Sequence, residues 1–202
     1  MKLYVLSDIH AEFTAFTPDP KALQAADVVV LAGDIHDGEF VPTWARETFG
    51  DVPIIWVAGN HEFYNHHWER CLADMRRAAK QRSMHFLENE TVTIDGVDFL
   101  GATLWTDFEM MGSKSESITE ASRYMVDYRK ISGCSPFKTI ERHNHVVAFV
   151  GVGDRGGNSS LAQFEAATIS THLAGLPVQH SSVRYAIAWP ATSMTCAALC
   201  KS

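Results

Sequence analysis

Long hydrophobic runs are missing from this sequence. No stretch approaches the ~18 consecutive apolar residues that a membrane-spanning helix needs. The first apolar run, residues 3–6, ends before Asp8 and is shorter than the ~7 to 15 residue core of a secretory signal. We therefore expect a cytoplasmic protein without a membrane partner.

Cysteine is scarce, and its spacing excludes the common cysteine sites. The four cysteines are Cys71, Cys134, Cys196 and Cys200. None of them forms the CxxC pair that is typical of a zinc knuckle or a redox motif. We expect reduced thiols with a structural role.

An excess of positive charge is also absent, because the formal net charge is -7 at pH 7. A protein that follows a phosphate backbone depends on Lys and Arg, so a nucleic-acid partner is not expected. The glycine-rich residues 151–160 lack the GKS or GKT ending of a phosphate loop. That difference argues against a nucleotide cradle.

The composition is otherwise that of an ordinary globular protein, with 46% hydrophobic and 20% charged residues in 202. Neither an internal repeat nor a low-complexity segment is visible. Since domains usually contain ~100 to 200 residues, we expect a single domain over residues 1–202.

Apolar runs alternate with helix-like segments in the first part of the chain. Residues 3–6, 27–32 and 53–58 predict buried strands, and residues 21–26 and 39–49 predict helices between them. This alternation indicates an α/β fold.

Further along, the pattern changes several times. Apolar residues three and four apart predict an amphipathic helix over residues 64–82. Strands are then expected at residues 86–87, 91–94 and 97–100, which favours a second sheet that is mainly antiparallel. We also expect a mobile loop over residues 107–117, a helix over 140–150 and a short strand over 166–171. Residues 187–202 carry no recognisable chemistry.

Polar residues with metal-binding capability follow the predicted strands. Asp8 and His10 follow the first strand, Asp34 the second and Asn60 the third, and His172 follows the short strand at 166–171. A mixture of imidazole nitrogen with carboxylate and amide oxygen suits zinc, iron or manganese. A bridging carboxylate can hold two such ions ~3.5 to 4 Å apart, the geometry used to hydrolyse phosphate esters.

The order and spacing of these residues resemble the calcineurin-like metallophosphoesterase family. The matching blocks are Asp8-x-His10, Gly33-Asp34 and Gly59-Asn60-His61-Glu62. The similarity extends through residues 101–106 and 127–129, and more loosely through 168–172, so residues 1–150 match well and 151–202 diverge. The resemblance implies an α/β fold in which a β-sandwich is flanked by helices.

The resemblance also implies a function, the metal-dependent hydrolysis of a small phosphate ester by a metal-activated hydroxide. It leaves open whether the substrate is a phosphodiester or a phosphomonoester. The cofactors would be two divalent ions of manganese, iron or zinc. By resemblance, Asp8 and His10 bind the first ion, Asp34 bridges, and Asn60 and His172 bind the second. The catalytic residues would be His61, beside the phosphate, and Asp8, which would orient the His61 ring.

One family feature is absent from the sequence. Family members normally have a Gly-His-x-His block near the carboxyl end, and here only His180 follows His172. This difference predicts a C-terminally truncated member of the family. It leaves open the alternative of a catalytically weak or inactive remnant that binds metal or phosphate. Truncation would expose sheet edges and apolar surface, which favours a homodimer or a higher homo-oligomer.

Overall fold

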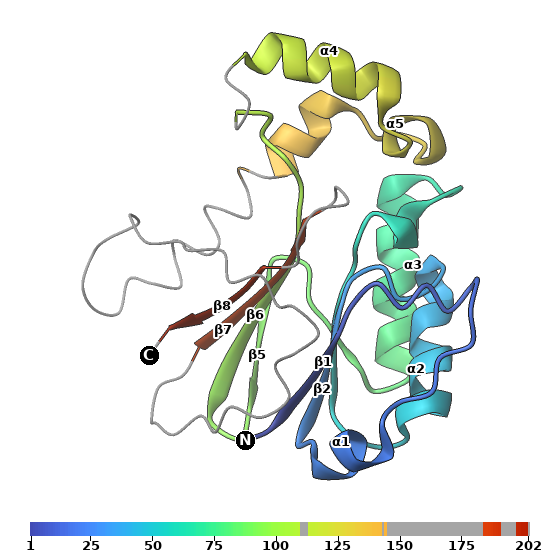
Figure 1. The fold of residues 1–202 in the computed structure, drawn as a ribbon, viewed down its shortest axis with the longest axis vertical. Coiled ribbons are helices and arrows are strands. Elements are labelled where there is room, and N and C mark those ends of the chain that lie inside the picture. Colours follow the sequence, from blue (N-terminus) through green and yellow to red (C-terminus); the bar gives the residue numbers. More distant parts are fainter. Residues whose placement is uncertain (110–112, 143, 145–183, 191–196, 202) are drawn as a thin grey trace.

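The structure is a computed structural model that describes residues 1–109, 113–142, 144, 184–190 and 197–201. Two sheets lie face to face, and helices cover the outer face of one of them (Figure 1). Among the described residues, every helix is too short or too polar to span a membrane.

The first sheet is parallel, with strand order β1-β2-β3-β4. Its strands are β1 (Leu3–Leu6), β2 (Val28–Ala32), β3 (Ile54–Val57) and β4 (His85–Phe86). The crossovers contain α1 (Pro20–Ala25), α2 (Val41–Phe49) and α3 (Trp68–Gln81), with the short 3-10 helices η1 (Gly38–Phe40) and η2 (His61–Phe63). Because the strands are parallel, their carboxyl ends share one edge of the sheet.

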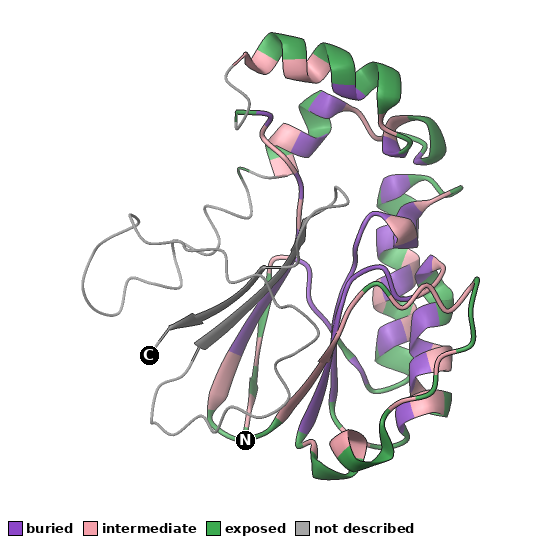
Figure 2. Ribbon diagram, viewed as in Figure 1, coloured by how far each residue is buried: buried purple, intermediate pink, exposed green. Residues whose placement is uncertain are grey.

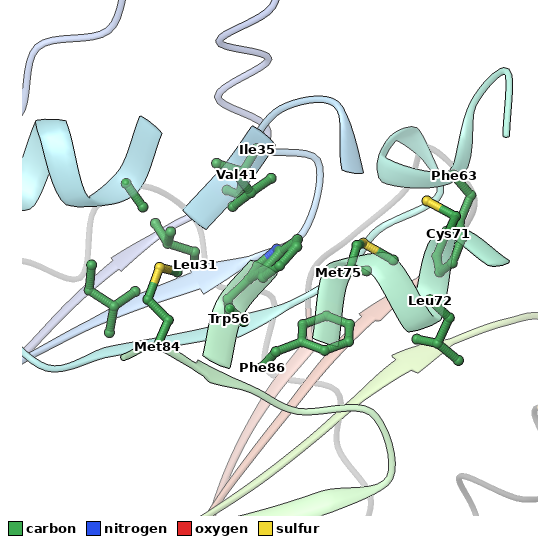
Figure 3. Packing of buried hydrophobic residues seen from close by; sticks show 14 of the residues in the cluster. Leu31, Ile35, Val41, Trp56, Phe63, Cys71, Leu72, Met75, Met84 and Phe86 are labelled. Atoms are coloured by element: carbon green, nitrogen blue, oxygen red, sulfur yellow. The ribbon is translucent and has the colours of Figure 1, made fainter. Parts of the chain in front are cut away.

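Side chains alternate between the two faces of the parallel sheet, as the two-residue repeat of a strand requires. On β2, Val29 and Leu31 face the helices, whereas Val28 and Val30 face the second sheet. On the helical side, Trp56 of β3 packs against Met75 of α3 and the other apolar residues of that core (Figure 3). Burial on both faces explains why these strands are continuously apolar. Figure 2 shows β2 buried in the middle of the molecule, and the helices beside it exposed on their outer side.

The second sheet has the order β5-β6-β7-β8. Its strands are β5 (Glu90–Ile94), β6 (Val97–Leu104), β7 (Arg184–Pro190) and β8 (Ala197–Lys201). The β5–β6 and β7–β8 pairs are antiparallel, but β6 and β7 are parallel. Two more helices, α4 (Lys114–Tyr124) and α5 (Asp127–Lys130), lie beyond the carboxyl edge of the parallel sheet (Figure 1).

Gly101 allows β6 to approach the first sheet closely. A methyl group at this position would lie 2.4 Å from Cβ of Leu87 and 2.8 Å from Cγ1 of Val57. We expect Gly101→Ala to lower the free energy of unfolding by about 1–3 kcal/mol, because overpacking forces neighbouring backbone to move. Urea denaturation measures the change. The control Thr91→Ala, at an exposed position of β5, should cost less than about 0.5 kcal/mol. Equal stability of the two variants would contradict this account of the close approach.

The predicted fold class is confirmed, and three local predictions need correction. The helix predicted to begin at residue 64 begins at Trp68, because the residues before it pair with residues 130–132. Asn65 N–H donates to Lys130 O at 2.8 Å and Ser132 N–H donates to His66 O at 2.9 Å, which keeps these residues out of the helix.

The second correction concerns β4, which pairs parallel with β3 and so belongs to the first sheet rather than the second. The second sheet is mainly antiparallel, as expected, although β6 and β7 pair in parallel. The third correction is that the loop predicted over residues 107–117 ends in helix α4, whose Ser113 cap accepts a hydrogen bond from Glu116 N–H at 3.4 Å. Of the predicted 140–150 helix, residues 140–142 and 144 are described and are helical, and this helix begins at residue 136. The predicted strand at 166–171 lies outside the described residues.

Candidate metal centre

The loops that follow β1 and β2 run side by side beyond the carboxyl edge of the sheet. Asp8 N–H donates to Gly33 O at 3.1 Å, and His10 N–H donates to Asp34 O at 3.1 Å. Asp8, His10 and Asp34 have φ angles of 51°, 48° and 54°, in the left-handed region. Residues other than glycine rarely adopt this backbone conformation. Residues that do adopt it are concentrated at functional sites, where the surrounding contacts stabilise the conformation. The backbone is therefore shaped to bring these side chains together.

Three of the expected ligands meet at this edge. One donor atom from each of Asp8, His10 and Asp34 lies within 4.8 Å of the others. Asp34 is 7% exposed, and its Oδ1 accepts a hydrogen bond from His61 N–H at 3.0 Å. Burial outweighs that hydrogen bond and raises the pKa of Asp34 to about 6. A cation at this position would favour the ionised carboxylate.

Glu62 fixes the loops on which the ligands lie. Its side chain is fully buried and accepts hydrogen bonds from the backbone N–H groups of Asp34 at 3.1 Å, Ile35 at 2.9 Å and Gly59 at 2.9 Å. Burial and the charge of Asp34 raise the pKa of Glu62 to about 8. One carboxylate thus joins the loop after β2 to the loop after β3. The sequence indicates Glu62 only as the last residue of its motif.

Asn60 is oriented by two neighbours. Its Nδ2 donates to Asp127 Oδ1 at 2.7 Å and to Tyr64 Oη at 3.0 Å. Tyr64 Oη also donates to Asp127 Oδ1 at 3.3 Å. These contacts engage the amide nitrogen, which leaves the carbonyl oxygen as the atom that can bind a cation. Asp127 begins α5, so the helices beyond the sheet edge help to build the site.

His61 has a partner that the sequence did not indicate. We expected Asp8 to orient its ring, but Glu12 Oε1 lies 3.0 Å from His61 Nδ1, and a carboxylate can only accept this hydrogen bond. The ring also lies near Tyr64 and His10, with centroid separations of 4.3 and 4.4 Å. Glu12 is 49 residues from His61 in the sequence, and no spacing rule connects them.

The structure bears differently on the remaining site predictions. His172 lies outside the described residues, so its role as a ligand stays a prediction. The roles of Asp8, His10, Asp34 and Asn60 as ligands also stay predictions, although the structure places the first three together. The donor set fits a divalent ion, because carboxylate and imidazole groups come together on partly buried, acidic loops.

Comparison with known proteins supports this interpretation. The model of the family described as calcineurin-like phosphoesterase matches residues 1–159, which include every block of the motif. None of the curated proteins compared with the chain matches it. The family match covers most of the chain, from β1 to beyond α5. The protein belongs to the calcineurin-like phosphoesterase family.

Proposed function

We propose that this protein hydrolyses small phosphate esters with divalent ions held at the carboxyl edge of the parallel sheet. The observation that carries the proposal is that Asp8, His10 and Asp34 come together on two adjacent loops, where all three residues have φ angles in the left-handed region. Family membership supports the same reaction class. Asp8, His10, Asp34 and Asn60 are the described residues that would hold the ions, and His172 is a further candidate.

The bound ions would supply Lewis acidity, which stabilises charge on phosphoryl oxygens and lowers the pKa of water. His61 would supply the proton chemistry. Its Nδ1–H is engaged by Glu12 Oε1, so Nε2 is the nitrogen that can donate a proton to the leaving oxygen. Asp34 accepts a hydrogen bond from the backbone N–H of His61, which helps to position His61. A proposed metal ligand is thus in direct contact with the proposed acid.

Removal of metal tests the proposal. We expect chelation to abolish hydrolysis of p-nitrophenyl phosphate or bis(p-nitrophenyl) phosphate. Addition of Mn²⁺, Fe²⁺ or Zn²⁺ should restore it, because the ions contribute several kcal/mol to transition-state stabilisation. The two substrates distinguish a monoesterase from a diesterase. Activity that survives chelation, with no metal found by elemental analysis, would contradict a metal-dependent reaction.

The same experiment separates a second candidate function. The sequence lacks the Gly-His-x-His block of the family, which favours a protein that binds metal or phosphate with little turnover. Stoichiometric metal without hydrolysis of either substrate would support that alternative. Stoichiometric metal with turnover would exclude it.

A further inference from the structure

Glu12 lies between two imidazole rings. Its Oε1 is 3.0 Å from His61 Nδ1 and 3.4 Å from His10 Nδ1. The two rings are nearly perpendicular, with their centroids 4.4 Å apart. The side chain of Glu12 is 14% exposed, compared with 22% for His61 and 31% for His10. The three side chains thus form a partly buried group with access from solvent.

Hydrogen bonds within the described part of the chain do not satisfy this group. His10 Nδ1 and Glu12 Oε2 are both buried and have no hydrogen-bond partner there. His61 takes the one carboxylate oxygen that lies between the rings. A buried polar atom without a partner is costly, and such atoms in a native structure often indicate an ion or a water.

The spacing of the group matches a tetrahedral ion. Zinc bonds to nitrogen and oxygen are about 2.0–2.1 Å long, so two ligands of a tetrahedral ion lie about 3.3 Å apart. The two separations at Glu12 Oε1 are 3.0 and 3.4 Å. One donor atom from each of His10, Glu12 and His61 lies within 4.8 Å of the others.

We propose that His10, Glu12 and His61 form a second site for a zinc-like divalent ion, which overlaps the first group at His10. Two imidazoles and one carboxylate are a set that zinc accepts, with the fourth position open to water. Imidazole donors favour zinc over the harder manganese ion.

Occupation of this site would inhibit the enzyme, and this part rests on the proposed function. An ion bound to His61 Nδ1 would replace the proton and the Glu12 hydrogen bond at that nitrogen, which weakens Nε2–H as a proton donor to the leaving oxygen. It also competes for His10 with the ion at Asp8 and Asp34. Excess Zn²⁺ should therefore inhibit hydrolysis, whereas excess Mn²⁺ should not.

Binding is tested without activity, on the full chain after chelation. Asp34→Asn removes a carboxylate from the first group and leaves the proposed ligands in place. We expect this variant to bind Co²⁺ with the visible absorption of a four-coordinate ion, and Zn²⁺ to displace it. Adding Glu12→Gln should weaken Zn²⁺ binding at least tenfold, and adding Glu47→Gln, at an exposed position of α2, should not. Circular dichroism checks that each variant is folded.

Equal Zn²⁺ affinity with and without Glu12 would overturn the site. Adding His61→Gln to Asp34→Asn should also remove the four-coordinate cobalt band, since His61 is a proposed ligand and not only a neighbour. Inhibition is measured separately, as the Zn²⁺ concentration that halves each protein's own activity. That concentration should rise at least tenfold in Glu12→Gln, and an unchanged value would overturn the inhibitory role. Absence of hydrolysis under all conditions would contradict the proposed function, while the cobalt experiment would still decide whether the ion binds.

Discussion

Replacing Asp34 with asparagine is expected to lower kcat/KM for phosphate-ester hydrolysis by about 10³-fold or more. The substituted amide would keep the shape of the side chain and could still accept the hydrogen bond from His61 N–H. It would lose the negative charge that holds divalent ions, whose contribution is several kcal/mol, and about 4 kcal/mol corresponds to 10³ in rate. Steady-state kinetics and elemental analysis of the same samples measure both effects.

Without metal, the same variant is expected to be more stable than the parent protein at neutral pH. Burial raises the pKa of Asp34 from 3.8 to about 6, so ionisation of this group opposes folding. Its stabilising contribution is complete below about pH 3.8 and is lost as the pH rises to about 6. The gain in Asp34→Asn at pH 7 should approach about 3 kcal/mol at most and disappear near pH 4. Thermal unfolding of chelated protein over this pH range checks the sign.

The matched control is Asp51→Asn, which removes an exposed carboxylate just after α2. It should change neither activity nor metal content. Full activity in Asp34→Asn would contradict the assignment of Asp34 as a metal ligand. A loss of activity together with a loss of folded structure would indicate a scaffold role instead.

Replacing His61 with glutamine is expected to lower kcat by about 10² to 10⁴-fold, the usual contribution of a positioned acid. The His61→Gln variant should still bind metal in stoichiometric amounts, because the proposed catalytic ions are held by other residues. The loss should be larger for an alkyl phosphate than for a p-nitrophenyl ester, since a poor leaving group depends more on protonation. Steady-state kinetics with both substrates provides the comparison.

His66→Gln is the control for this experiment, because His66 lies on the same segment and is exposed. It should leave kcat within about twofold, as expected for a surface substitution away from the site. An equal loss for both leaving groups would contradict the role of His61 as an acid. It would favour a role in binding phosphoryl oxygens.

The parts of the fold that the sequence predicted are those in which local pattern and tertiary environment agree. β2 and β3 are apolar on both faces because both faces are buried, so their limits follow from composition. The ligand loops are predictable for a related reason, since a polar residue directly after a buried strand lies at the sheet edge. Asp34 and Asn60 were found in this way.

The remaining features depend on contacts between distant segments. Glu12 contacts His61 only once the loop after β1 has packed against the segment after β3. Tyr64 lies four residues before Trp68, which is a helical spacing, but residues 65–67 pair with residues 130–132, and this tertiary contact overrides the local preference. Asp127 orients Asn60 from 67 residues away. Helix α4 differs, because its Ser113-x-x-Glu116 start is a local capping signal that is visible in the sequence.

The buried Glu62 side chain also determines at which stage the loops around the site become ordered. The amides of Asp34, Ile35 and Gly59 are bound to one buried side chain. The conformational entropy of the loops after β2 and β3 is therefore lost when the chain folds. We expect a cation to bind to these loops with little further loss of conformational entropy.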